Sequence, residues 1–204
     1  MAAYGFNENA GTTVADASGR GNTGTVNLTT WSTSGRIGNA LVFNGMTSWV
    51  TVPDAASLDL TTAMTVEAWV FPTAISGDWI SLVSKEQASS LAYFLYASGA
   101  GPPAQGVFTG GSERLLYGTQ TLPVNAWTHL AATYDGAQQR LFVNGVQVTS
   151  RAQTGAIATT TLPLRIGGNA PYGNFFTGRI DEVRVYNRAL TQPEISADMT
   201  RPVP

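Results

Sequence analysis

The sequence predicts an all-β protein, an antiparallel β-sandwich of the jelly-roll type that ends in a short helical turn. Three observations carry this prediction. Apolar residues alternate with a period of 2 in short segments rich in Val, Ile, Thr and aromatic residues. Clusters of Gly, Asn, Asp and Pro separate these segments. The one clear helix-start signal lies close to the end of the chain. Regularly spaced short strands of this kind are typical of sandwiches and barrels.

The strand elements follow one another along most of the chain. Two Asn-Gly pairs, Asn44-Gly45 and Asn144-Gly145, favour hairpins, because a type I′ turn needs positive φ at both central residues. The second pair is the stronger signal, since apolar residues lie on both sides of it. The most regular strand segments are predicted at residues 65–71, 79–84, 91–97, 128–134, 140–143 and 179–186.

Residues 91–96, LAYFLY, are apolar on both faces of the predicted strand. A strand covered on both sides has this pattern. A strand whose outer face is an aromatic binding surface has it too, and the pattern does not separate the two.

The helical turn is predicted at about residues 192–199. Thr191 and Glu194 have the spacing of a capping box, and Pro193 suits the first turn of a helix. The 204 residues match one domain of about 100–200 residues. We therefore expect a single domain over residues 1–204, with a core at about 3–190 and this helix as its cap.

Composition and charge exclude several classes of protein. Only 12% of the residues are charged and the net charge is −2, which does not suit binding to the nucleic-acid backbone. There is no cysteine for a disulfide or thiolate site. No apolar run approaches the ~18 residues of a membrane span. No signal peptide is predicted in this stretch, which opens directly in a strand-like segment, as a module of a larger multidomain chain would.

Catalytic patterns are scarce. The one histidine, His129, lies inside a strand pattern, and the 13 acidic residues are mostly isolated. Asp181 and Glu182 are adjacent, so they point to opposite faces of a strand rather than forming a carboxylate pair. A polysaccharide lyase or hydrolase is the least favoured function. It would have to use Lys85, Glu86, Tyr93, Glu113, Arg114 and Tyr117.

Residues 16–24, DASGRGNTG, form a loop with two side chains suited to calcium. Asp16 and Asn22 offer hard oxygen ligands, and the glycines allow backbone carbonyls to converge. An Asx-turn loop without an ion has the same residues. From the loop alone both interpretations stay open.

Aromatic and amide residues in predicted loops suggest a glycan surface, because sugar rings stack on aromatic rings while amides and charges bind hydroxyl groups. We single out Lys85, Arg114, Tyr172 and Phe175 as candidate ligand-binding residues, because charged and aromatic side chains are scarce elsewhere in the predicted loops.

The chain resembles the laminin-G-like, concanavalin A-like lectin/glucanase jelly-roll family. The resemblance rests on ordered blocks that span nearly the whole chain: AYGFNENAG at 3–11, DASGRGNTG at 16–24, GNALVFNG at 38–45, VTVP at 50–53, TVEAWV at 65–70, WTHLAATYDG at 127–136, LFVNG at 141–145, IGGN at 166–169 and GRIDEVRVYNRAL at 178–190.

The resemblance implies two antiparallel sheets in which the first and last strands are neighbours. It also implies a structural Ca²⁺ held by the carboxylates of Asp16 and Asp181, by Asn22, and by backbone oxygens around Gly19 and Arg20. Family members are mostly accessory modules of secreted bacterial polysaccharide-degrading enzymes, or recognition domains. The family's Glu-x-Asp-x-x-Glu and Gln-x-His catalytic signatures are absent from this sequence.

The function predicted on these grounds is a non-catalytic carbohydrate-binding module of a secreted bacterial polysaccharide-acting protein, located outside the cell. Its partner would be a polysaccharide or other glycan. The alternative is a protein–protein recognition, adhesion or spacer domain. A large exposed apolar patch without converging polar groups would favour that alternative.

Overall fold

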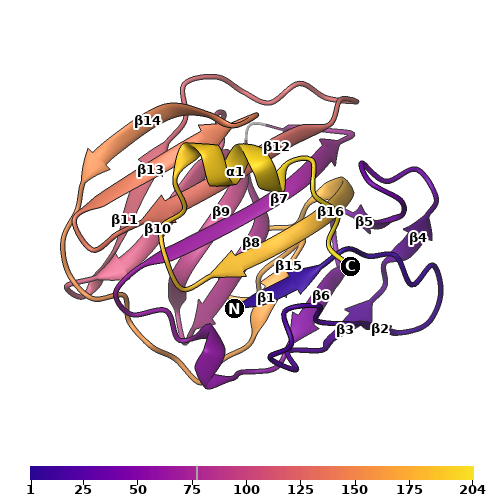
Figure 1. The fold of residues 1–204 in the computed structure, drawn as a ribbon, viewed down its shortest axis with the longest axis horizontal. Coiled ribbons are helices and arrows are strands. Elements are labelled where there is room, and N and C mark those ends of the chain that lie inside the picture. The colour runs from indigo at the N-terminus through magenta and orange to yellow at the C-terminus, as the bar shows by residue number, and fades with distance from the viewer. Residues whose placement is uncertain (77) are drawn as a thin grey trace.

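The computed structural model describes residues 1–76 and 78–204 and contains two antiparallel β-sheets packed face to face (Figure 1). Sheet A, which carries α1 on its outer side, has the strand order β14-β13-β12-β7-β16-β5-β4, with β1 also paired to β16. Sheet B has the order β11-β10-β9-β8-β15-β6-β3-β2 and lies behind sheet A in Figure 1. This architecture confirms the predicted β-sandwich.

The strands of sheet A are β1 (Ala2–Tyr4), β4 (Thr30–Ser32), β5 (Ala40–Asn44), β7 (Met64–Pro72), β12 (Thr128–Tyr134), β13 (Gln138–Val143), β14 (Val146–Ala152) and β16 (Thr177–Tyr186). Those of sheet B are β2 (Thr13–Val14), β3 (Gly24–Asn27), β6 (Trp49–Val52), β8 (Trp79–Gln87), β9 (Ser90–Gly99), β10 (Ala104–Thr109), β11 (Ser112–Tyr117) and β15 (Leu164–Ile166). A 3₁₀ turn, Ala56–Leu58, and the helix α1, Gln192–Asp198, complete the elements.

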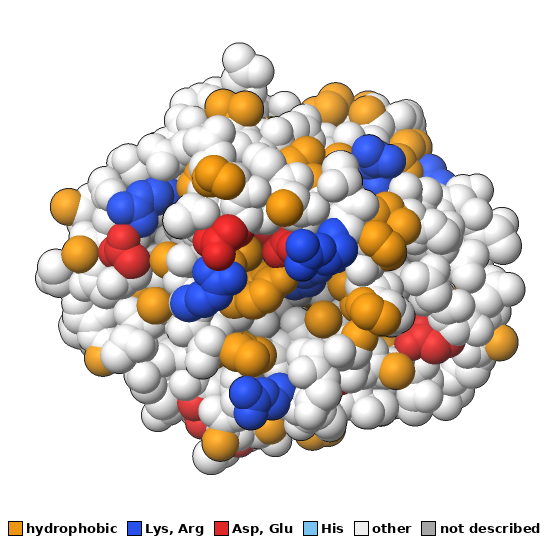
Figure 2. Space-filling view, in the orientation of Figure 1, with side chains coloured by type: hydrophobic (Ala, Val, Ile, Leu, Met, Phe, Trp, Pro, Cys, Tyr) orange, Lys and Arg blue, Asp and Glu red, His pale blue; other side chains and the backbone are white. Residues whose placement is uncertain are grey.

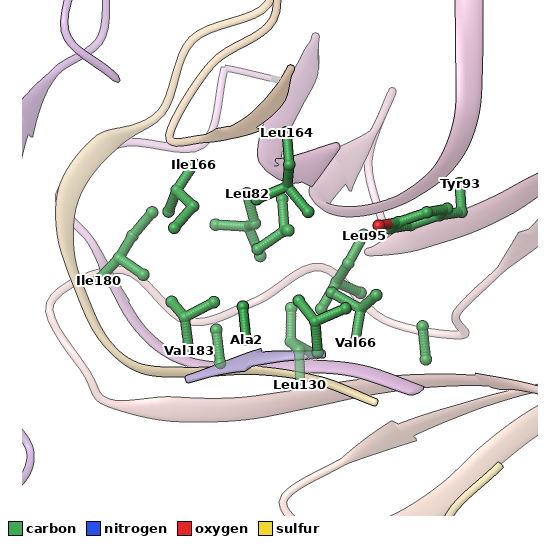
Figure 3. Packing of buried hydrophobic residues seen from close by; sticks show 14 of the residues in the cluster. Ala2, Val66, Leu82, Tyr93, Leu95, Leu130, Leu164, Ile166, Ile180 and Val183 are labelled. Carbon is green, nitrogen blue, oxygen red and sulfur yellow. The ribbon is translucent and has the colours of Figure 1, made fainter. Parts of the chain in front are cut away.

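The core lies between the two sheets. Figure 3 shows Leu82, Leu164 and Ile166 of sheet B facing Ile180 and Val183 of sheet A. These side chains are at most 1% exposed, and most belong to alternating strand positions. Burial of apolar surface contributes roughly 25 cal/mol per Å², so this layer supplies most of the stability of the sandwich.

The predicted strands agree with the observed ones. The prediction for residues 128–134 matches β12, while β7, β8, β9, β13 and β16 extend one to three residues beyond the predicted ends. The first and last strands are neighbours, because β1 pairs antiparallel with β16 through Ala2–Val185 and Tyr4–Val183.

The two Asn-Gly pairs have different roles. Asn144 and Gly145 have φ angles of 49° and 76°, and they join β13 to β14 in the predicted hairpin. The hairpin prediction for Asn44-Gly45 is wrong, because β5 lies in sheet A and the next strand, β6, lies in sheet B. The side-chain Oδ1 of Asn44 instead accepts hydrogen bonds from the backbone N–H groups of residues 46, 47 and 48, which turns the chain from one sheet to the other.

The C-terminal helix α1 covers part of the outer face of sheet A. Its capping box is present, since the backbone N–H and the hydroxyl of Thr191 each lie 2.8 Å from Oε2 of Glu194. Ile195 is buried against Ala131 of β12 and Phe142 of β13. Neither helical segment in the described ranges is long and apolar enough to cross a membrane.

Candidate functional site

The outer face of sheet B carries a row of aromatic side chains. Along β9, Tyr93 and Leu95 point into the core, and Phe94 and Tyr96 belong to a separate apolar cluster on the other face. This arrangement follows from the period-2 alternation of a strand. Phe94 and Tyr96 are only 1% and 2% exposed, because other side chains pack over them. Of the two interpretations of the LAYFLY run, the structure therefore supports a strand that is covered on both sides, with aromatic residues on its outer face.

Neighbouring strands extend this surface. Phe94 lies opposite Gly106 of β10, and Gly106 lies opposite Leu115 of β11. Trp79, at the start of β8, packs edge-on against Tyr96 with ring centroids 5.7 Å apart. Directly opposed side chains on one sheet face are in contact, so these residues form one continuous apolar floor.

A pocket of about 440 Å³ lies over this floor. Its size falls in the range of roughly 300–1,000 Å³ that is usual for small-molecule sites. The residues that line it are Trp79, Phe94, Tyr96, Glu113, Leu115, Tyr172 and Asn174.

The segment of residues 168–176 forms one wall of the pocket. Asn169 donates from Nδ2 to the hydroxyl of Tyr96 at 2.8 Å. The backbone N–H of Ala170 donates to Oε1 of Glu86 at 2.7 Å. At the rim, the hydroxyl of Tyr172 donates to Oε1 of Glu113 at 2.8 Å. These bonds hold the segment against sheet B without filling the pocket.

Three polar atoms at the pocket are left to bind a ligand. All three hydrogen bonds to Glu113, from Ser90, Leu91 and Tyr172, end on Oε1, and within the described chain Oε2 accepts none. The hydroxyl oxygen of Tyr96 accepts from Asn169 and Asn174, so its own hydrogen is free to donate. Oδ1 of Asn174 likewise accepts no hydrogen bond from the described residues.

The protonation state of Tyr96 supports its role as a donor. Burial raises the pKa of this phenol well above its ordinary value, against a smaller lowering by the hydrogen bonds from Asn174 and Asn169. Tyr96 therefore keeps its hydrogen at any physiological pH. The pocket combines aromatic stacking surface, one donor and two acceptors, which is the set of groups that a sugar ring and its hydroxyls need.

The four residues predicted to bind a ligand do not lie together. Tyr172 lines the pocket. Phe175 lies in the same segment but stacks on Trp49 with ring centroids 5.5 Å apart. Arg114 lies between Glu113 and Leu115 on β11, so it belongs to the opposite face of the strand.

The placement of Lys85 does not support its predicted role. Its side chain is 1% exposed and forms an ion pair with Asp54. Its Nζ also donates to the carbonyl oxygen of Leu162 at 2.6 Å. Lys85 lies beside Leu164 on the inward side of β8, where a buried ammonium needs these partners.

Most of the pocket was not predicted from the sequence. Trp79, Phe94, Tyr96, Glu113 and Asn174 are not among the four residues predicted to bind a ligand. The both-faces apolar run of residues 91–96 was the signal that pointed to Phe94 and Tyr96.

The residues predicted to bind calcium are held by backbone and hydroxyl donors. Oδ1 of Asp16 accepts from the N–H groups of Ala3 and Ser18, and Oδ2 accepts from the N–H of Asn22 and the hydroxyl of Ser18. These bonds keep the pKa of Asp16 below its usual value despite the opposing effect of burial. The amide of Asn22 donates to the carbonyl of Met1 and accepts from Ser57.

Asp181 lies at a register shift of β16 against β7, between residues 181 and 184, and its side chain is fully buried. Its Oδ2 accepts from the backbone N–H groups of Arg36 and Ile37 at 2.8 and 2.9 Å, and Oδ1 accepts from Glu182. Burial raises its pKa to about 7, while the backbone hydrogen bonds act in the opposite direction.

Calcium needs converging oxygen ligands, whereas the carboxylates of Asp16 and Asp181 face N–H and O–H donors in two separate hydrogen-bond sets. Gly19 and Arg20 lie in the Asp16 loop. Among the described residues no group of three or more His, Cys, Asp or Glu side chains is placed to hold a metal ion. This arrangement does not fit the predicted set of ligands. Calcium binding stays a prediction from the family resemblance.

Comparison with known proteins places the chain in a family. A model of the concanavalin A-like lectin/glucanases superfamily matches residues 44–196. The chain belongs to this superfamily, as its resemblance implied.

Solved structures share the fold along nearly the whole chain. Domain 4 of AbnA, an extracellular arabinanase from Geobacillus stearothermophilus, was solved in complex with arabinotriose. It superposes with a TM-score of 0.80 at 24% identity, over 98% of this chain and 97% of that one. The binding domain of Paraclostridial Mosquitocidal Protein 1 gives a TM-score of 0.78 at 17% identity, over 97% of this chain and 51% of that one. At these identities the likeness shows the fold.

Curated relatives match a shorter stretch. Pappalysin-1 of Mus musculus is 44% identical over 78 residues, which are 36% of this chain and 5% of that protein. Human pappalysin-1 is 42% identical over a stretch of the same length. This chain therefore corresponds to only a small part of the length of these relatives.

Proposed function

We propose that this chain is a carbohydrate-binding domain whose ligand occupies the pocket on the outer face of sheet B. The observation that carries the proposal is the combination, in one pocket, of the accessible rings of Trp79 and Tyr172 as stacking surface with Oε2 of Glu113 and Oδ1 of Asn174 as open acceptors. The buried rings of Phe94 and Tyr96 form the floor beneath them. The structural likeness to a domain solved with arabinotriose supports it.

The charge of the pocket favours a neutral glycan. Glu113 is the one ionisable acid among the described lining residues, and no Lys or Arg is among them. A carboxylate without a neighbouring cation repels uronic or sialic acid groups, and the repulsion is strong in a partly buried site. Neutral pentose or hexose polymers are therefore the ligands that we expect.

Binding rather than catalysis is the proposed activity. Glycoside hydrolysis ordinarily uses two carboxyl groups on either side of the scissile bond, and this pocket offers Glu113 alone among its described lining residues. We also propose a location outside the cell, which the description of AbnA as extracellular supports. The further proposal, that the domain is part of a larger bacterial polysaccharide-acting protein, rests on the family resemblance.

Affinity electrophoresis against a panel of polysaccharides tests the proposal. Arabinan is the first neutral polymer to use, with xylan, galactan and mixed-linkage glucan beside it, and polygalacturonate and alginate represent anionic polymers. We expect retardation by at least one neutral polymer and none by the anionic ones. The Tyr172→Ala variant should weaken this retardation because it removes a side chain that lines the pocket.

The matched control is Val146→Ala, which shortens a 59% exposed apolar side chain on β14 of the other sheet. Its retardation should equal that of the unmodified chain. Retardation that Tyr172→Ala leaves unchanged would place the glycan elsewhere. No retardation by any polymer would contradict the proposed function and favour a role in protein recognition.

A further inference from the structure

A second pocket lies directly beside the proposed glycan site. Its volume is about 450 Å³, close to that of the first. The two pockets have Trp79 and Asn174 in common among their lining residues. The two pockets therefore adjoin, with Trp79 at the boundary between them, and together they are called the groove.

The second pocket is lined by different chemistry from the first. Phe175, stacked on Trp49, offers the aromatic surface, and Thr177 and Asp78 add polar groups. Oδ2 of Asp78 accepts from the hydroxyl of Ser76 at 3.1 Å, and within the described chain Oδ1 accepts no hydrogen bond. The first pocket thus suits stacking, whereas the second suits hydrogen bonds to hydroxyl groups.

Asn174 can contribute to both halves of the groove. Its Nδ2 points to the hydroxyl of Tyr96 at 3.4 Å, which is a long hydrogen bond. Its Oδ1 is open, and the residue lines both pockets. An amide at such a boundary can accept from a hydroxyl group on either of two consecutive sugars.

We propose that the site binds at least two consecutive sugar residues of a neutral glycan, one in each pocket. This inference rests on the proposed function and adds a second subsite to it. It predicts that affinity rises with the length of the oligosaccharide, because a monosaccharide can fill only one half of the groove.

Isothermal titration calorimetry with matched saccharides tests the second subsite. The probes are arabinose and arabinotriose, with xylose and xylotriose as a second pair. We expect one of the trisaccharides to bind at least about tenfold more tightly than its monosaccharide, since two or three added hydrogen bonds are enough for such a gain.

Two variants locate the effect. Asp78→Ala and Thr177→Val remove the polar side-chain atoms of the second pocket. Combined, they should weaken trisaccharide binding about three- to tenfold and leave monosaccharide binding unchanged. The control is Thr159→Val, at an exposed threonine in a separate surface hollow near Asp59.

The outcomes separate this inference from the proposed function. Equal affinity for monosaccharide and trisaccharide would overturn the second subsite and leave the carbohydrate-binding function intact. A length dependence that the double variant does not change would also overturn it. If neither pair of saccharides binds to the unmodified chain, the second subsite is overturned. The proposed function fails with it only if no neutral polymer retards the chain in affinity electrophoresis.

Discussion

Gly106 shows how a single residue shapes the proposed binding surface. The ring of Phe94 occupies the space above Gly106, and a Cβ atom at this position would overlap that ring. The glycine in β10 therefore lets the aromatic floor lie close to the sheet. The contact between Phe94 and Gly106 follows only from the pairing of β9 with β10, because the two residues lie on different strands and share no sequence motif.

Replacing this glycine should disturb both the fold and the pocket. In Gly106→Ala the new methyl group pushes Phe94 toward the pocket, and overpacking of this kind costs about 1–3 kcal/mol. We expect lower stability in urea denaturation and weaker retardation in affinity electrophoresis. A variant of unchanged stability and binding would contradict the assigned role of Gly106.

Asp181 is a second residue whose role is open to a direct test. Asp181→Ala leaves the buried N–H groups of Arg36 and Ile37 without their acceptor, and we expect a loss of about 1–3 kcal/mol in the free energy of unfolding. Asp181→Asn should lose less, because its amide oxygen can still accept. Urea denaturation of both variants measures their free energies of unfolding. An equal loss in the two would show that Asp181 stabilises the fold through its charge and not through its hydrogen bonds.

Individual site residues were the hardest to predict from the sequence. Tyr172 was found because it is an aromatic residue beside amides in a loop. Lys85 was misjudged because its partners, Asp54 and Leu162, are brought to it only by the packing of the sheets. The roles of Glu113 and Asn174 could not be assigned from the sequence, since each depends on an oxygen atom that the fold leaves without a hydrogen bond in the described chain.

At the scale of elements, α1 and the segment that follows it cover buried polar groups of sheet A. Trp69 of β7 donates from Nε1 to the carbonyl of Met199 at 3.1 Å, and Tyr186 of β16 donates to Asp198 at 2.7 Å. Beneath them, Nε2 of His129 lies 3.9 Å from Oε2 of Glu67, and both side chains are fully buried. Burial raises the pKa of Glu67 and lowers that of His129 to about 3, so both groups favour their neutral forms.

This arrangement predicts that the domain loses stability in acid through His129. The unfolded histidine has a pKa near 6.5 and the folded one about 3, so the unfolded state binds more protons between these values. Stability should fall as the pH drops below 6.5, by at most about 1.4 kcal/mol per pH unit for this one group. Glu67 acts in the opposite direction, because its raised pKa makes the folded state bind the proton more tightly.

Urea denaturation at pH 7.5 and pH 4.5 isolates the histidine. His129→Gln cannot bind this proton. As the pH falls, the free energy of unfolding of the variant should therefore rise relative to that of the unmodified chain. A difference that stays constant across this range would contradict the assigned effect of His129.

The loop of residues 16–24 gives a prediction about metal removal. Because Asp16 already accepts four hydrogen bonds from N–H and O–H donors, we expect EDTA to leave the melting temperature unchanged. Differential scanning calorimetry with EDTA and with added Ca²⁺ measures this. A fall of several degrees in EDTA that Ca²⁺ restores would show that the loop rearranges around an ion, as the family resemblance implies.

Strand elements were predictable because their signals are local. Alternation places β7, β9 and β12 within a few residues of their ends, and the capping box marks the start of α1. The Asn44-Gly45 turn was misassigned because an Asn-Gly pair specifies a tight turn but not whether the next strand joins the same sheet.

For the whole molecule, the sandwich was predicted from strand pattern and family resemblance together, but neither indicates which face carries the site. Figure 2 shows the face with α1 and both termini, where hydrophobic, acidic and basic side chains are interspersed. The aromatic groove lies on the other sheet, where β8, β9, β10 and β11 meet the segment of residues 168–176. Its position depends on contacts between parts of the chain that are far apart in sequence, so no local pattern could specify it.

The central claim is that a neutral glycan binds on the outer face of sheet B. The most direct test is a ¹⁵N-labelled NMR titration with arabinotriose and xylotriose, followed through backbone amide shifts. We predict that one of the two shifts amides of β8, β9, β11 and residues 168–176, and leaves those around α1 unchanged. Shifts gathered around α1 on sheet A, or no shifts with either trisaccharide, would contradict the account.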